Sequence, residues 1–158
     1  MKPTVYIETT VVSYLTAWPS RDVVRLSHEM ITREWWSKQR PLFDLYVSEV
    51  VIREVSAGDR VAAKERLDAL AGIPSLPTDP RALELADRLA TALALPQRAR
   101  LDAAHVAMSA VHGVSFLLTW NCKHLANAAL ADRIERTCSD AGFTAPRVVT
   151  PEMLMEAP

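Results

Sequence analysis

Four side chains with oxygen atoms, Glu8, Glu54, Asp102 and Asn121, stand where a folded chain can use them together. Three are carboxylates and the fourth is a carboxamide, and oxygen ligands of this kind suit hard cations such as Mg²⁺ or Mn²⁺. A bound divalent cation binds phosphate oxygens and lowers the pKa of a coordinated water. The chemistry that such a cluster favours is metal-assisted hydrolysis of a phosphodiester bond.

Glu8 and Asn121 each follow an apolar run that predicts a buried strand, Val5–Ile7 and Val114–Thr119 respectively. A carboxylate at the end of a buried strand is costly unless it is paired, and ligands bind at the carboxyl ends of parallel strands. Asn121 taken alone is also a natural turn residue or N-cap. Their shared position after strands predicts that both lie at one edge of a sheet.

Glu54 belongs to a predicted helix that starts at Ser48 and runs to about Ala57. On a helical wheel Glu54 falls inside the apolar arc, whereas Glu49 and Arg53 share the opposite side as an i,i+4 ion pair. A lone carboxylate inside an apolar arc is expensive, so we expect Glu54 to point toward a site. The alternative is a side chain at the edge of the arc that reaches water.

Asp102 stands at the entrance to residues 103–122, a run of twenty residues without Asp, Glu, Lys or Arg. Such a run predicts a central helix and strand, and Gly113 with two histidines argues against a membrane span. Asp102 alone is equally consistent with an acid placed near a helix start by the helix dipole. His105, one turn further on, is interpreted as a hydrogen-bonded helix histidine, with membership of the site as the alternative.

Strand-like and helix-like segments alternate along the rest of the chain. The order predicts an α/β sandwich with a mainly parallel sheet, because parallel neighbours need helical crossovers. The predicted strands are 5–7, 42–47, 114–119, a short 147–149 and an edge strand at best at 74–77; the predicted helices are 9–15, 22–41, 48–57, 60–71, 79–93, 97–111 and 127–141.

Length, composition and charge restrict the class of protein. The 158 residues predict a single domain, 1–158, and 49% hydrophobic with 23% charged residues is ordinary for a globular protein. A net charge of −1 neither supports nor excludes RNA as a partner. Without a signal peptide or metal-type cysteine spacing, the expected location is the cytoplasm, with no membrane partner. The absence of a Walker loop and of GxGxxG disfavours kinase and dehydrogenase chemistry.

Four motifs together resemble the PIN-domain family, of the kind found as the ribonuclease toxin of VapBC-type bacterial toxin–antitoxin pairs. The opening YIETTVVSYL is similar to the family's strand that ends in an acid, here Glu8. VSEVVIREVSAG resembles its strand-then-helix segment, with the acid at Glu54. RLDAAHVAMSAVHGVSFLLTWN resembles its third acid, central helix and strand, ending in T-x-N/D, which map to Asp102 and Asn121.

The resemblance implies a three-layer α/β/α sandwich and an endoribonuclease that uses Mg²⁺ or Mn²⁺. It assigns the catalytic and metal-binding roles to Glu8, Glu54, Asp102 and Asn121. It also implies an RNA substrate, a small antitoxin protein in a type II pair, and a homodimer. The sequence departs from the family at two of these positions, where Glu8 and Asn121 stand in place of the usual Asp.

Two other functions stay open on the residues alone. The two departures are consistent with a catalytically degenerate PIN-like module that binds RNA or protein without cleaving it. A weaker alternative is a metal-dependent phosphohydrolase acting on a small substrate.

Overall fold

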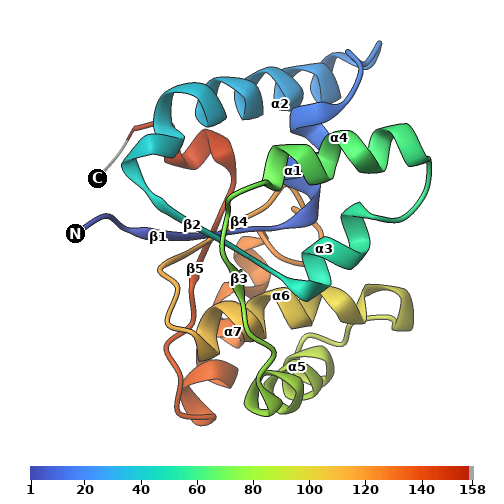
Figure 1. Cartoon of the computed structure of the whole chain (residues 1–158). Coiled ribbons are helices and arrows are strands. Elements are labelled where there is room, and N and C mark those ends of the chain that lie inside the picture. The colour runs from blue at the N-terminus through green and yellow to red at the C-terminus, as the bar shows by residue number, and fades with distance from the viewer. Residues whose placement is uncertain (157–158) are drawn as a thin grey trace.

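The computed structural model describes residues 1–156 and is organised around a five-stranded, all-parallel sheet (Figure 1). The strands lie in the order β3-β2-β1-β4-β5. Their bounds are β1 (Thr4–Ile7), β2 (Asp44–Ser48), β3 (Ser75–Leu76), β4 (Phe116–Leu118) and β5 (Arg147–Val149).

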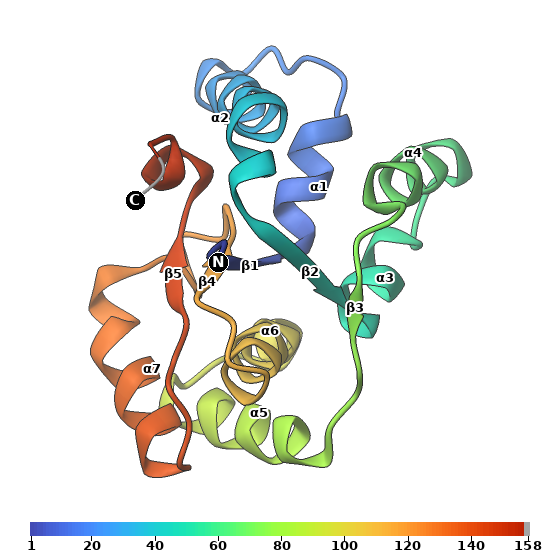
Figure 2. The ribbon, with the colours of Figure 1, turned by 60° about the vertical axis from the view of Figure 1, so that its left-hand side comes forward.

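Helices cover both faces of this sheet. Figure 2 shows α1, α2 and α4 on one face and α5, α6 and α7 on the other, while α3 contacts helices of both layers. The predicted α/β/α sandwich is therefore confirmed. The helices are α1 (Thr9–Thr16), α2 (Val23–Glu34), α3 (Glu49–Val55), α4 (Arg60–Leu70), α5 (Pro80–Ala92), α6 (Arg100–Val111) and α7 (Ala128–Asp140).

The central strand, β1, is the most deeply buried element. Val5, Tyr6 and Ile7 have no exposed surface, and the strand pairs with β2 on one side and β4 on the other. A strand covered by helices on both faces reads as a continuous apolar run, which is why the sequence predicts it well.

The order in which strands are added to the sheet reverses at β1. The chain builds β2 and β3 on one side of β1, crosses through α5 and α6, and builds β4 and β5 on the other side. The crevice beyond the carboxyl ends of β1 and β4 is thus the topological switch point, where open parallel sheets bind their ligands. Glu8 follows β1 at this point, and Thr119 follows β4.

The predicted helix 22–41 and strand 42–47 both need correction. The α-helix starts beyond an Asp22 cap and ends at Glu34, and a wider π-helical turn then leads to a 3₁₀ turn at Arg40–Leu42. Pro41 has no N–H and cannot continue a helix, so β2 begins only at Asp44. The wider turn places Trp35 in the core, where its ring stacks on Phe43 at 5.7 Å.

Other boundaries differ by a few residues. Only Phe116–Leu118 of the predicted strand 114–119 pairs, and the predicted helix 97–111 starts with a 3₁₀ turn at Gln97–Ala99. The edge strand at 74–77 is confirmed as two residues, β3. A 3₁₀ turn at Pro151–Leu154, capped by Thr150, was not predicted. Among residues 1–156, no helix is long and apolar enough to cross a membrane.

The two cysteines lie in opposite environments, and we expect them to react differently. Cys138 on α7 is fully buried, and burial raises the pKa of its thiol to about 11, whereas Cys122 is exposed. Because the thiolate is the reacting form, a disulfide reagent near neutral pH should titrate one thiol in the native protein and two after denaturation. Cys122→Ser should abolish the native reaction and Cys138→Ala should leave it; rapid reaction of both native thiols would contradict the burial.

Candidate functional site

Glu8 is a buried carboxylate at the carboxyl end of β1 whose oxygens are both bound by the chain itself. Its side chain is the N-cap of α1 and accepts a hydrogen bond from the Thr10 N–H at 2.7 Å. The other oxygen accepts from the hydroxyls of Thr10 at 2.7 Å and Thr119 at 2.5 Å. With 3% exposure, Glu8 joins the starts of two neighbouring connections, after β1 and after β4.

Asn121 follows β4 and organises a turn. Its N–H donates to the Thr119 hydroxyl at 2.9 Å, and its side-chain oxygen accepts from the His124 N–H at 3.0 Å. Its carbonyl accepts from the Ala126 N–H at 2.8 Å. Asn121 therefore has the turn role that its residue type favours, and its side-chain oxygen is already engaged.

Asp102 reaches the same group through His124. The His124 Nδ1 atom lies 3.1 Å from the Asp102 carboxylate, and the two side chains are 18% and 21% exposed. His124 also contacts Asn121, whose N–H contacts Thr119, which donates to Glu8. A continuous path of hydrogen bonds thus connects the first and third predicted acids.

Glu54, near the end of α3, points inward as the helical wheel predicts. One of its oxygens accepts from the Thr9 hydroxyl at 2.9 Å and lies 2.7 Å from the Nε2 atom of His105. The His105 N–H does not point along this contact, so the interaction is an ion pair rather than an aligned hydrogen bond. The Glu54 side chain is 30% exposed, and it forms the outer end of this contact.

His105 is the buried partner that connects Glu54 to the central strand. Its Nδ1 atom lies 2.8 Å from the Tyr6 hydroxyl, which lies 2.6 Å from the Ser48 hydroxyl. Burial raises the pKa of the Tyr6 phenol, so this hydroxyl stays protonated. Ser48, where the sequence predicts the start of this helix, stands at the N-cap of α3, but its hydroxyl bonds to Tyr6 instead of the helix.

The surroundings of His105 shift its pKa in opposite directions. Burial alone would lower its pKa, but the contact with Glu54 and the charges of Glu8, Glu54 and Asp102 raise the pKa above its ordinary 6.5. Burial alone would raise the pKa of Glu54, and His105 with Thr9 outweighs it and holds the pKa below 4.5. The raised pKa of His105 and the lowered pKa of Glu54 both favour the charged form of this pair.

The structure thus brings the four predicted residues to one edge but not into a ready-made coordination shell. Within residues 1–156, no three Asp, Glu, His or Cys side chains are grouped closely enough to hold a metal ion. The oxygens of Glu8 and Asn121 are occupied by hydroxyls and N–H groups. Three carboxylates and a carboxamide still fit a hard cation by their chemistry, and such a cation would replace some of these contacts.

Sequence reasoning did not assign Tyr6, Ser48, Thr9 or His124 to this edge. Tyr6 carried a usable signal, because a tyrosine in a strand buried on both faces needs a partner for its hydroxyl. Thr10 and Thr119 both contact Glu8 through their hydroxyls. For His124, next to Lys123 after Asn121, no local pattern indicated the contact to Asp102.

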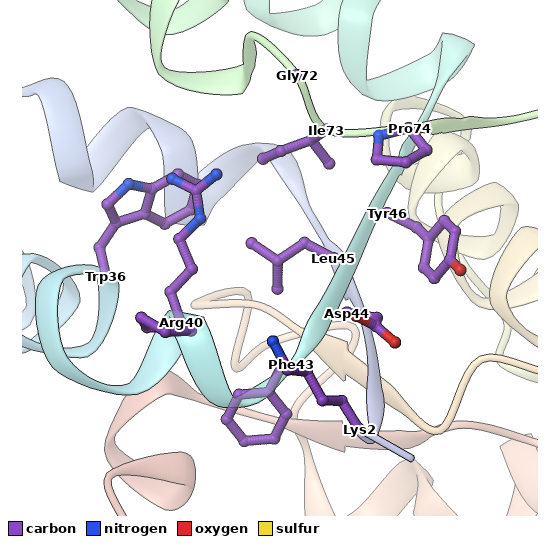
Figure 3. A pocket seen from close by; sticks show the side chains of 11 residues that line it. Lys2, Trp36, Arg40, Phe43, Asp44, Leu45, Tyr46, Gly72, Ile73 and Pro74 are labelled. Carbon is purple, nitrogen blue, oxygen red and sulfur yellow. The ribbon is translucent and has the colours of Figure 1, made fainter.

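Two hollows in the surface lie away from these residues. One, of about 530 Å³, is a wedge between the start of β2 and residues 72–74, with Leu45 and Ile73 facing each other across it (Figure 3). The other, of about 1100 Å³, lies between α7 and β5. Neither of these two hollows includes Glu8, Glu54, Asp102 or Asn121.

Comparison of the chain with protein-family models and with curated proteins gives no match.

The ion pair of Glu54 and His105 should give the protein a characteristic pH dependence of stability. A carboxyl whose pKa is lowered in the fold stabilises above its unfolded pKa of 4.5 and stops doing so as pH falls through the folded value. An imidazole whose pKa is raised stabilises below 6.5 and stops doing so as pH rises through the folded value. The contribution is therefore largest between pH 4.5 and 6.5.

Urea unfolding of the wild type and of Glu54→Gln in a chelating buffer tests this window. The variant should lose roughly 1.5–3 kcal/mol of unfolding free energy in the window and less on either side. Glu49→Gln is the matched control, because its exposed partner Arg53 contributes little. A difference between wild type and Glu54→Gln that stays constant with pH would contradict the ion pair.

Proposed function

We propose that this protein is a metal-dependent endoribonuclease that hydrolyses RNA phosphodiester bonds with Mg²⁺ or Mn²⁺. The observation that carries the proposal is the position of three carboxylates from three separate elements at the topological switch point of the sheet. Glu8 follows β1, Glu54 lies on α3 in contact with His105, and Asp102 lies on α6 in contact with His124. Several carboxylates at the ligand-binding edge of the sheet are what cation-assisted phosphate chemistry requires.

The four residues would have different duties in such a site. Glu54 and Asp102 are partly exposed, at 30% and 21% of their side chains, and would meet a cation and the substrate phosphate from solvent. Glu8 lies behind them, held in one orientation by Thr10 and Thr119. Asn121 would add a neutral oxygen. When bound, the cation would activate a water and neutralise charge on the phosphate.

The resemblance to the PIN family supports a more specific role as the toxin of a type II toxin–antitoxin pair in the cytoplasm. A small antitoxin protein and a second copy of the chain are the partners that this role requires. An adjacent, upstream gene for a short protein with a DNA-binding head and an amphipathic tail would support it. Without such a gene the toxin role would weaken, and the nuclease proposal would not.

A second function, that of a degenerate module that binds RNA or protein without cleavage, also has an observation in its favour. The oxygens of Glu8 and Asn121, the two positions that depart from the family, are satisfied by the chain's own donors. A carboxylate with three internal hydrogen bonds has less need of a cation. Calorimetry with Mn²⁺ separates the two functions, because the module should bind no cation.

RNA cleavage by the wild type should require Mg²⁺ or Mn²⁺ and stop on chelation. Asp102→Asn and Glu54→Gln should each reduce the rate by about 100-fold or more, since each removes a charge that holds the cation, while the fold persists. An end-labelled single-stranded RNA resolved on a gel gives the rates. Glu49→Gln, in an exposed ion pair on the same helix, should keep full activity.

Two results would overturn this function. Cleavage that is indifferent to chelator would remove the metal from the mechanism. Turnover of a generic phosphodiester without any cleavage of RNA would instead favour a phosphohydrolase of small substrates.

A further inference from the structure

We propose that a stacked strip of side chains, Arg25, Tyr14, His28 and Trp120, binds the bases of single-stranded RNA and feeds the strand to the carboxylates. This inference rests on the proposed function, because it specifies how the substrate of that same site is held. The strip comes from α1, α2 and the segment after β4, and none of its residues is one of the four predicted site residues.

The rings of the strip are stacked at close range. His28 lies over Trp120 with ring centroids 4.0 Å apart and planes 11° apart. Tyr14 lies 6.2 Å from both rings, inclined by 23° to His28 and 30° to Trp120. The guanidinium carbon of Arg25 stands 5.2 Å from the centre of the Tyr14 ring. Three aromatic rings and a guanidinium therefore form one stacked group.

The inner end of the strip is fixed to the proposed site. Trp120 lies directly before Asn121, and its N–H donates to the Thr10 hydroxyl at 2.9 Å, which in turn donates to Glu8. The indole N–H of Trp120 donates to the Thr32 hydroxyl at 2.7 Å. These bonds hold the ring in one orientation at the edge where the carboxylates meet.

The outer end of the strip opens to solvent. Trp120 is 7% exposed, whereas Tyr14 and His28 are partly exposed and Arg25 is exposed. The strip therefore runs from the carboxylates to the surface along α1 and α2, which lie side by side (Figure 2). Core packing accounts for a buried Trp120, but it does not need two rings with polar edges and a guanidinium at the surface.

Single-stranded RNA is the ligand that this combination fits. Unpaired bases stack on aromatic rings and on arginine, whatever the base, because every base has a π face. Such stacking contributes about 1–3 kcal/mol per base, which corresponds to roughly 5- to 150-fold in affinity. Bases in a duplex are already stacked, so the strip selects single strands.

Binding to the wild-type protein in a chelating buffer tests the inference without any variant. A fluorescent ten-nucleotide RNA is compared by anisotropy with a chain of the same length and charge that lacks bases, and with the RNA annealed to its complement. The intact single strand should bind at least about 5-fold more tightly than either. Equal affinity for the base-free chain or for the duplex would overturn the inference, as would no binding of any of them.

Paired substitutions locate the effect on the strip. Tyr14→Ala and His28→Ala should each remove most of the advantage of the intact strand over the base-free chain, whereas Tyr14→Phe and His28→Phe, which keep a ring, should retain it. Thermal melting checks that each variant is folded. An unchanged advantage in both alanine variants would overturn the strip as the binding surface.

The outcomes separate this inference from the proposed function. Metal-dependent cleavage with no base-dependent binding would leave the nuclease standing and remove the strip. Base-dependent binding that needs Tyr14 and His28, with no cleavage, would keep the strip and favour the binding module.

Discussion

The candidate site depends on one buried imidazole, His105, which pairs with Glu54 and feels the charges of two further carboxylates, Glu8 and Asp102. His105 has almost no exposed surface, and it is held between Tyr6 of the central strand and Glu54 of α3. Carboxylates that approach one another in a low-dielectric interior repel strongly unless a positive charge lies among them. Through its contacts with Tyr6 and Glu54, His105 connects α6 to β1 and to α3 in addition to the apolar core.

The sequence predicts those features of the site that follow from local patterns of apolar and polar residues. Apolar runs mark β1 and β4, and the helical wheel shows that Glu54 points inward, because burial imposes a period on the chain. The partners of these residues depend on distances between elements far apart in sequence, such as Tyr6 with His105, and no local pattern encodes them. The end of α2 is missed for a related reason, since the wider turn that follows it packs Trp35 against Phe43 in the core, a contact that no local pattern encodes.

The edge is divided into an inner and an outer part with different physical character. Inside, Glu8, Thr119 and Asn121 are satisfied by one another and by backbone N–H groups, which makes this part rigid. Outside, Glu54 and Asp102 keep a share of exposed surface and bond to histidines. In the proposed site, such a floor beneath partly solvated carboxylates would let a ligand exchange without disturbing the core.

The Glu8 side chain is long enough to bridge two elements. Its carboxylate caps α1 at Thr10 and also accepts a hydrogen bond from Thr119. One side chain thus connects the first helix to the segment that follows β4, the neighbour of β1. Any event that draws this carboxylate outward releases both attachments at once. Because Glu8 bonds to both, we expect the first turn of α1 and the segment after β4 to open together, as a single cooperative unit in amide exchange.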